Sequence, residues 1–385
     1  MRRARIACLL LALIGADICG AAAQTDATRH ACEAQAASGV DAKRLAALAR
    51  GFNLTGWLDG PTVRRPDLTV LVRLRERGFT HVRLPVMGEH VMEAFSSREH
   101  VAQHLAELDR AIDTLIGLGF TVSLDMHPGD RFGRLHVAEP DKGLGLLTSL
   151  WRTLAQRYAD RPADKLLFEV LNEPHVAVPI WNRQGPLLVQ TIRREAPRHT
   201  IVYGPAHYQR IDVLRDMAPL PDPNVVYAAH FYDPMIFTHQ GADWSDEDPL
   251  RHVSGVPFPV RASDDRIVAL LARLTGEGRV KAGALVLKDV AAPWTEQRIA
   301  AAIGEAGAWA TRHRRPVIIN EFGVLGFKAA PADRARWLRA VRTAAEQHCI
   351  GWTHWEYADG FGFLRRVDGR EIPDEAIVDA LIGRP

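Results

Sequence analysis

The alternation of short apolar runs with helix-like runs is the feature that most constrains how this chain of 385 residues can fold. Eight runs have the length and composition of buried strands: 51–54, 81–84, 121–125, 166–171, 200–203, 225–230, 317–321 and 350–355. Helical patterns lie between them, among them 68–77, 101–118, 144–158, 186–195, 295–312 and 332–347. Regular alternation of this kind predicts βα units and a parallel sheet. Eight units fit a closed (β/α)₈ TIM barrel better than an open doubly wound sheet.

One interval interrupts this alternation after the sixth predicted strand. Residues 233–293 are rich in turn-forming, acidic and proline residues and include one further helical pattern, 264–274. Loops of this length in compact domains are usually functional or disordered. We therefore expect an extended loop that overhangs the C-terminal face of the barrel as a wall or a lid. A Gly-rich phosphate-binding motif after the first strand is missing, which argues against a dinucleotide-binding fold.

The N-terminus has the three regions of a secretory signal peptide. Arginines at positions 2, 3 and 5 precede an apolar stretch over 6–14, and small residues follow at 20–23. We expect cleavage near Ala23 and a periplasmic or secreted protein. The alternative, a membrane anchor, needs about 20 apolar residues, more than this run supplies. The expected organisation is a signal peptide over 1–23, a lead-in over 24–49 and one catalytic domain over 50–385.

The charge of the chain bears on its partner, and its cysteines bear on a possible disulfide. The net charge is only +2, and no basic patch indicates a nucleic-acid partner. Two cysteines, Cys32 and Cys349, lie outside the signal peptide. In an exported protein they form either one disulfide or two buried thiols, and the sequence leaves both possibilities open.

Two glutamates stand at the ends of predicted strands. Glu173 follows the apolar run 166–171, and Glu321 ends the run 317–321. In a barrel, the C-terminal ends of the strands form the face that carries the chemistry. A pair of carboxyl groups facing one cleft is the minimum equipment for cleaving a glycosidic bond.

Other strand ends carry residues that complete a pattern. With the two glutamates, the set is Arg83, His127, Asn172, Glu173, His230, Tyr232, Glu321 and Trp355. These residues match the eight active-site positions of glycoside hydrolase family 5, the large cellulase family of retaining (β/α)₈ enzymes, which the chain resembles over residues 51–363.

The resemblance implies a role for each of these residues. Glu173 would be the acid/base and Glu321 the nucleophile of a double displacement. Arg83 and Tyr232 would contact Glu321, and His230 would contact Glu173. Asn172 would bind the sugar 2-hydroxyl, and His127 would also face the substrate. Glu169, close to this motif, is expected in a buried ion pair.

Aromatic side chains are expected to bind sugar faces. Trp355 is the predicted platform at the cleaved sugar, and Trp57 and Trp181 are candidates for further subsites. Trp244 and Phe361 also fall in or beside predicted loops. The alternative for loop tryptophans is that they fill the core.

Two other function classes would leave different residues at the strand ends. A metal-dependent barrel hydrolase would need closely spaced His-x-His ligands on a strand, which no predicted strand contains, so no metal or other cofactor is expected. A non-catalytic sugar-binding protein would be expected to lack one of the two glutamates. The sequence favours a monomeric cellulase-like endo-β-1,4-glucanase; the alternative is a glycosidase or transglycosylase acting on another β-glucan (1,3 or 1,6) or on mannan.

Overall fold

The computed structural model describes residues 32–33, 38–244, 247–368 and 370–383. The predicted signal peptide lies outside the described residues. Eight parallel strands close into a barrel in chain order, as the alternation predicted. They are β1 (Arg50–Asn53), β2 (His81–Met87), β3 (Thr121–His127), β4 (Leu166–Glu169), β5 (Thr200–Tyr203), β6 (Val225–Phe231), β7 (Val317–Phe322) and β8 (Gly351–His354).

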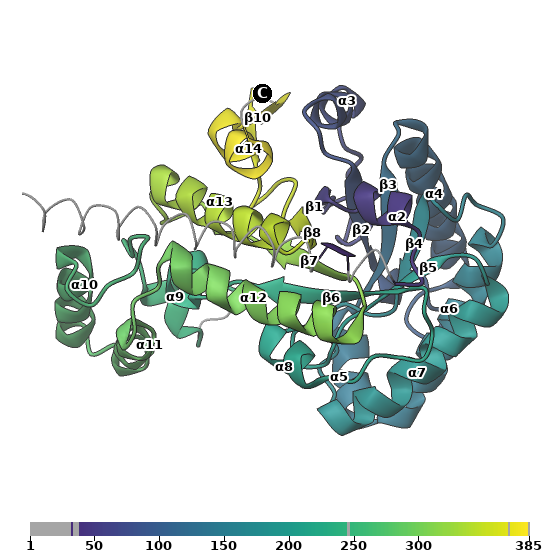
Figure 1. Ribbon diagram of the computed structural model, residues 1–385, viewed down its shortest axis with the longest axis horizontal. Coiled ribbons are helices and arrows are strands. Elements are labelled where there is room, and N and C mark those ends of the chain that lie inside the picture. Colours follow the sequence, from purple (N-terminus) through teal and green to yellow (C-terminus); the bar gives the residue numbers. More distant parts are fainter. Residues whose placement is uncertain (1–31, 34–37, 245–246, 369, 384–385) are drawn as a thin grey trace, which may run out of the picture.

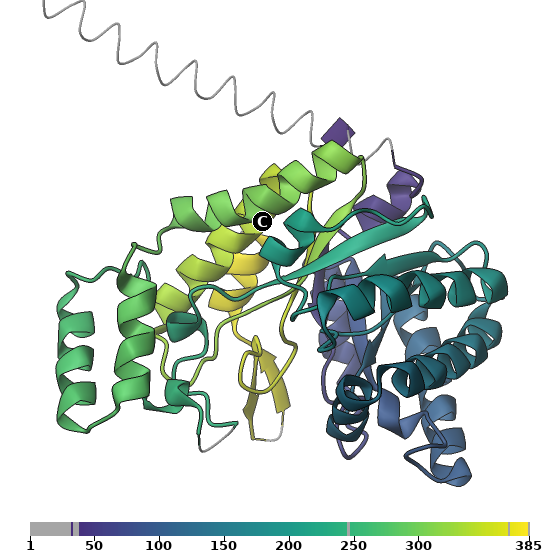
Figure 2. The ribbon, with the colours of Figure 1, turned by 90° about the horizontal axis from the view of Figure 1, so that it is seen from below.

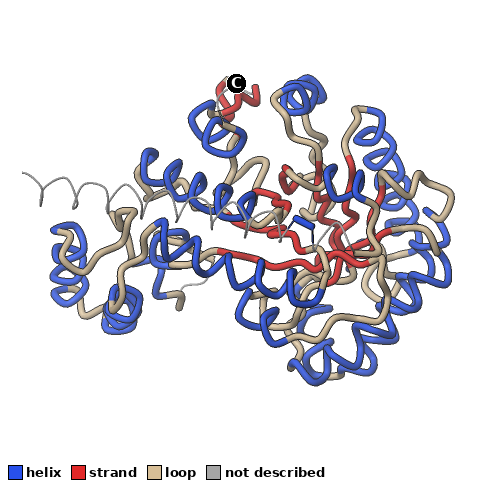
Figure 3. The backbone as a smooth tube through the Cα atoms, in the orientation of Figure 1, coloured by secondary structure: helices blue, strands red, loops and turns tan. Residues whose placement is uncertain are grey.

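Helices surround this sheet, with the strands gathered in the middle (Figures 1 and 3). The connecting elements are α3 (Leu68–Glu76), η1 (Gly88–His90), α4 (Arg98–Gly117), α5 (Asp130–Ala138), α6 (Pro140–Tyr158), α7 (Val178–Glu195), α8 (Ile211–Asp216), α12 (Glu296–His313) and α13 (Pro331–Gln347). After β8 come a two-stranded hairpin, β9 (Leu364–Val367) with β10 (Arg370–Pro373), and α14 (Glu375–Ile382).

Local sequence signals explain where several helices begin and end. Ser97 caps α4 by accepting a hydrogen bond from the backbone of His100. Gly78 and Gly119 follow α3 and α4 with φ of 106° and 87°, a conformation that glycine adopts without strain. Helix α7 begins eight residues before the predicted start, because Pro186 lies inside the helix instead of opening it.

Helix α2 (Ala42–Ala47) precedes β1 and lies at the N-terminal end of the barrel strands. Val40 and Leu48, on either side of this helix, pack against Leu167, Val202 and other apolar side chains of the barrel strands in a cluster separate from the main core. A disulfide joins Cys32 to Cys349, just before β8, with a Cα–Cα distance of 5.2 Å. Of the two possibilities left open by the sequence, the structure contains the disulfide.

The interval after β6 is a small subdomain instead of an irregular loop. It contains α9 (Met235–Thr238), η2 (Pro249–His252), α10 (Asp265–Gly276) and α11 (Val280–Val290). The predicted helix over 264–274 corresponds to α10, whereas α11 was not predicted. Figures 1 and 2 place the α10–α11 pair at one end of the molecule, beyond α9.

Candidate active site

The C-terminal ends of the strands surround a cavity of about 660 Å³. Side chains from five different strand ends line it, among them His127, Glu173, His230, Glu321 and Trp355. The apolar strand residues beneath them are buried and fix their positions. This is the face on which barrel enzymes carry out their chemistry.

An irregularity between β6 and β7 sets the position of one glutamate. Ala229 pairs with Ile319, but the next pair is His230 with Glu321, so Asn320 is an extra residue in β7. A bulge of this kind redirects the side chains that follow it. Asn320 donates to Glu169 inside the barrel at 2.8 Å, while its neighbour Glu321 reaches the cavity.

Glu321 is held by two donors. Arg83 Nη1 donates to Glu321 Oε1 at 2.7 Å, and the Tyr232 hydroxyl donates to Oε2 at 2.9 Å. Both hydrogen bonds favour the carboxylate over the acid. Burial and the charges of the neighbouring carboxyl groups raise the pKa of Tyr232 well above its ordinary value, so its hydroxyl keeps the proton that it donates.

Glu173 has a different environment. His230 Nδ1 lies 2.8 Å from Glu173 Oε1 and 3.4 Å from Glu321 Oε2. Burial raises the pKa of Glu173 above its ordinary value of 4.5. Burial also lowers the pKa of His230 to about 4, so this imidazole is neutral near neutral pH. An oxygen of Glu173 and an oxygen of Glu321 lie within 4.8 Å of each other.

Arg83 is fully buried and connects several acidic groups. Its guanidinium binds Glu169 through two hydrogen bonds of 2.8 Å and lies 3.1 Å from Asp125. It also donates to Asn172 Oδ1 at 2.7 Å. Burial alone would lower the pKa of Arg83, but the charges of Asp125, Glu169 and Glu321 raise it well above the ordinary value. The expected buried ion pair of Glu169 is therefore confirmed.

A second series of hydrogen bonds holds His127 and Asn172, which also line the cavity. Asp125 Oδ2 contacts His127 Nδ1 at 2.8 Å, and His127 Nε2 contacts Asn172 Nδ2 at 3.2 Å. The His127 ring stacks on Trp355, with ring centroids 5.7 Å apart. Burial lowers the pKa of His127, but the hydrogen bond and charge of Asp125 outweigh that effect and raise it.

This arrangement agrees with a match to a known family. The family model described as cellulase, glycosyl hydrolase family 5, matches residues 40–359. The chain belongs to glycosyl hydrolase family 5. The family predicted from the strand-end residues is therefore confirmed.

Curated relatives and solved structures agree with this family 5 assignment. The chain is 27% identical to Endoglucanase 3 of Fibrobacter succinogenes over 87% of its own length and 53% of that protein's. It is 28% identical to Cellodextrinase A of Ruminococcus flavefaciens over 52% of its length and 63% of that protein's. It thus spans about half to two thirds of the length of these relatives. A crystal structure of Thermotoga maritima Cel5A in complex with cellobiose is 26% identical, with a TM-score of 0.71 over 90% of this chain and 100% of that chain.

The eight residues matched to family 5 positions come together in the fold. Seven of them line the cavity, and Arg83 lies beneath it. The remaining two predicted substrate-binding residues do not reach it. Trp57 is 2% exposed and donates to Glu107, and Trp181 is fully buried and donates to the carbonyl of Gly204. The prediction that Trp57 and Trp181 bind substrate is wrong, because their rings turn into the packing between barrel and helices.

Trp244 and Phe361, the two other aromatic residues expected in or beside loops, do line the cavity. Their rings stack with centroids 6.3 Å apart, and Trp244 is 63% exposed. Trp244 belongs to the first part of the interval after β6, which therefore forms a wall of the cavity, whereas no residue of α10 or α11 lines it.

One residue that contacts Glu173 was not anticipated. Gln209 Oε1 accepts a hydrogen bond of 2.9 Å from the backbone N–H of Glu173, whose φ of 42° is unusual for a residue with a side chain. Gln209 is buried, and residues 207–209 all have positive φ. No sequence motif marks a loop of this shape, so its role becomes visible only in three dimensions.

Two groups of side chains in the described part of the chain have ligand atoms close enough to share a metal ion. One consists of Glu173, His230 and Glu321, where Arg83 and Tyr232 already bind the Glu321 carboxylate. The other consists of His90, His100 and His104, outside the cavity.

Among the described helices, none combines the length and the hydropathy needed to cross a bilayer.

Proposed function

We propose that this chain is a retaining glycoside hydrolase that cleaves β-linked glucan, with Glu173 as acid/base and Glu321 as nucleophile. The observation that carries the proposal is the pair of carboxyl groups with oxygens within 4.8 Å and with different environments. Retaining enzymes hold their carboxyl groups about 5–5.5 Å apart, whereas inverting enzymes need about 6.5–9.5 Å to fit a water molecule. The short separation supports the retaining mechanism.

The first step forms a glycosyl-enzyme intermediate. A carboxylate oxygen of Glu321 attacks the anomeric carbon while Glu173 gives its proton to the glycosidic oxygen, which leaves as an alcohol. The raised pKa of Glu173 suits a proton donor, and the two hydrogen bonds from Arg83 and Tyr232 suit an ionised nucleophile.

The second step returns both groups to their starting state. Glu173, now ionised, takes a proton from a water molecule, whose oxygen attacks the anomeric carbon and breaks its bond to Glu321. Because each step inverts the carbon, the product keeps the β configuration. His230, neutral and in contact with both carboxyl groups, can hold Glu173 in place in either protonation state.

The remaining cavity residues suit substrate binding. Asn172 contacts both Arg83 and His127, and in this proposal it binds the sugar 2-hydroxyl. Trp355 offers a flat apolar ring for a pyranose, and the Trp244–Phe361 stack offers a second one. Two platforms in one open cavity support an oligosaccharide or polysaccharide substrate, and the endoglucanase relatives support an endo-β-1,4-glucan.

The test uses the purified chain without residues 1–23 and measures the products released from carboxymethyl cellulose, mixed-linkage glucan, laminarin, pustulan and mannan. We expect short β-1,4-glucan oligosaccharides, and a loss of at least about 10³-fold in kcat for Glu173→Gln and for Glu321→Gln. Glu305→Gln is the matched control, because Glu305 also lines the cavity but pairs with Arg215 at its edge.

Azide distinguishes the two roles. With an activated aryl glycoside, Glu173→Ala plus azide should yield the β-glycosyl azide, whereas Glu321→Ala plus azide should yield the α-anomer. Full activity of both Gln variants would refute the site. Cleavage of laminarin, pustulan or mannan alone would refute the proposed substrate, and products longer than the starting oligosaccharide would indicate a transglycosylase.

We further propose that residues 50–385 act as one monomeric catalytic domain in the periplasm or outside the cell, after removal of residues 1–23. The Cys32–Cys349 disulfide supports export, because such bonds persist in oxidising compartments. Fractionation of cells that express the full chain, with N-terminal sequencing of the product, tests the export, and light scattering tests the monomer.

A further inference from the structure

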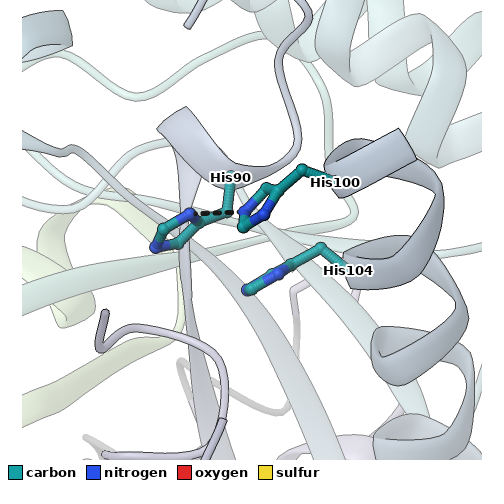
Figure 4. A group of neighbouring side chains, drawn as sticks. All are labelled: His90, His100 and His104. Atoms are coloured by element: carbon teal, nitrogen blue, oxygen red, sulfur yellow. Dashed lines mark hydrogen bonds between the residues drawn. The ribbon is translucent and has the colours of Figure 1, made fainter. Parts of the chain in front are cut away.

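Three histidines lie together at the edge of the barrel's C-terminal face, outside the cavity. His90 ends the short helix η1 after β2, while His100 and His104 are one turn apart on α4. Figure 4 shows the three rings facing one another, with His90 and His100 joined by a hydrogen bond. The proposed hydrolysis uses none of them.

The distances between the rings suit a shared ion. One nitrogen from each ring lies within 4.8 Å of the other two, and His90 Nδ1 is 2.9 Å from His100 Nε2. A tetrahedral zinc ion with bonds of about 2.0–2.1 Å needs nitrogens about 3.3 Å apart. Small rotations of the imidazole rings would therefore close the site without a change in the backbone.

The surroundings of His104 also suit metal binding. His104 is 6% exposed, and its Nε2 has no hydrogen-bond partner among the described residues. A buried ring nitrogen without a partner is costly, and a metal ion would satisfy it.

Nearby carboxylates are engaged elsewhere. Glu107 binds Arg65 through two hydrogen bonds and also accepts one from Trp57. Glu89 accepts a hydrogen bond from the backbone of Phe132. The site therefore offers nitrogen ligands only, which select ions such as Zn²⁺, Ni²⁺ or Cu²⁺ over Mg²⁺ and Ca²⁺.

We propose that His90, His100 and His104 bind one divalent transition-metal ion of the zinc type, with water in the remaining position. The ion would tie α4 to two loops of the C-terminal face. His90 and His104 already contact the backbone of Gly60 and Leu58 in the loop after β1, and Leu58 pairs with Val86 of β2. The role is structural, since none of the three histidines lines the cavity.

The test uses the purified chain without an affinity tag, stripped with EDTA and then titrated calorimetrically with Zn²⁺, Ni²⁺, Cu²⁺, Mg²⁺ and Ca²⁺. We expect one Zn²⁺ per chain, no binding of Mg²⁺ or Ca²⁺, and a rise of a few degrees in Tm with Zn²⁺. His100→Gln and His104→Gln should each weaken Zn²⁺ binding at least about tenfold.

Two controls keep the result specific. His313→Gln alters a half-buried histidine on α12 and should bind Zn²⁺ like the parent chain. Glu173→Gln alters the other possible ligand group and should also leave binding unchanged. Melting curves in EDTA show whether each variant is folded.

Zn²⁺ binding that survives both His→Gln substitutions, or that disappears in Glu173→Gln alone, would overturn the proposal. So would the absence of Zn²⁺ binding to the parent chain at concentrations up to about 100 µM, since structural sites bind far more tightly.

Discussion

At the scale of single residues, the site depends on two carboxyl groups that differ in their neighbours. Glu321 receives hydrogen bonds from a buried guanidinium and a phenol, whereas Glu173 faces a neutral imidazole. Burial acts on Glu173 without a direct cationic partner, and its pKa rises. This contrast in surroundings supports the proposal that Glu173 is the proton donor and Glu321 the nucleophile.

The pH dependence of catalysis should report the pKa of Glu173. Because the acid must be protonated, kcat/KM on a polysaccharide should fall as the pH rises through a pKa above the ordinary 4.5. An activated aryl glycoside needs no acid for bond cleavage, so its glycosylation rate should lack this decline. The measurement is the pH profile of kcat/KM for both substrates; the same decline on both would contradict the assignment.

The resemblance of the strand-end residues to glycoside hydrolase family 5 made most of the candidate site predictable. Arg83, His127 and the other matched positions follow barrel strands, and the closed barrel brings their side chains together. The direction of a loop side chain such as that of Trp57 is not fixed in this way, and Trp181 lies in the first turns of α7, which the sequence pattern placed later in the chain. Both rings are buried, so both were assigned to the wrong surroundings. Gln209 acts through its contact with a backbone N–H, which no motif encodes.

At the scale of elements, the eight strands and most surrounding helices follow from periodicity and caps. The subdomain after β6 is less predictable, because its short helices pack mainly on one another and carry turn residues between them. Helix α11 and the β9–β10 hairpin were not predicted. The first part of the subdomain nevertheless contributes to the cavity, through Trp244 and His239.

Removal of the Trp244 ring should weaken binding of longer substrates. In Trp244→Ala, we expect KM for long oligosaccharides to rise about tenfold, because a stacking surface is lost, while kcat on a short aryl glycoside stays unchanged. Trp294→Ala is the control, since Trp294 directly follows this subdomain and does not line the cavity. An equal effect of both substitutions would contradict a binding role.

Loss of the disulfide should reduce stability and leave catalysis intact. In Cys32→Ser/Cys349→Ser, the free energy of unfolding should fall by about 2–4 kcal/mol, because the unfolded chain is no longer cross-linked. The bond lies at the end of the barrel opposite the cavity, so kcat should not change. Urea unfolding measures the first effect and steady-state kinetics the second; a large fall in kcat would show that the two ends are coupled.

At the scale of the whole molecule, the two ends of the barrel have different tasks. The C-terminal ends of the strands carry charged and aromatic residues around a cavity, while the N-terminal end is closed by Val40, Leu48 and the disulfide. Between them, a large apolar core buries several neutral histidines. Burial lowers the pKa of His81 to about 3 and that of His199, with nearby arginines, to about 4.

Acid should destabilise the fold through these histidines. In the unfolded chain these histidines bind protons near pH 6.5, but in the folded protein they bind them only near their lowered pKa values. Their contribution to the free energy of unfolding is therefore fully present above pH 6.5 and is lost as the pH falls towards 4. His199→Phe should reduce this loss, since His199 stacks on Phe168 and lies away from the cavity.

The measurement is Tm from about pH 7 to about pH 4.5 for both proteins. The Tm of His199→Phe relative to that of the parent should rise as the pH falls. A pH-independent difference between them would contradict the role of His199. The variant must be compared with the parent at each pH, because other groups also change the stability. Burial raises the pKa of Glu356 to about 8, so protonation of Glu356 stabilises the fold as the pH falls, opposite to the effect of the histidines.

The bond between Cys32 and Cys349 also makes a covalent ring of almost the entire catalytic chain, since 317 positions separate the two cysteines. A protease that cuts a single exposed loop anywhere within this ring, for instance between α10 and α11, would leave one molecule instead of two fragments. The nicked enzyme would keep its original mass under non-reducing electrophoresis and separate only after reduction. Such a ring prevents the dissociation that would otherwise follow the first cut.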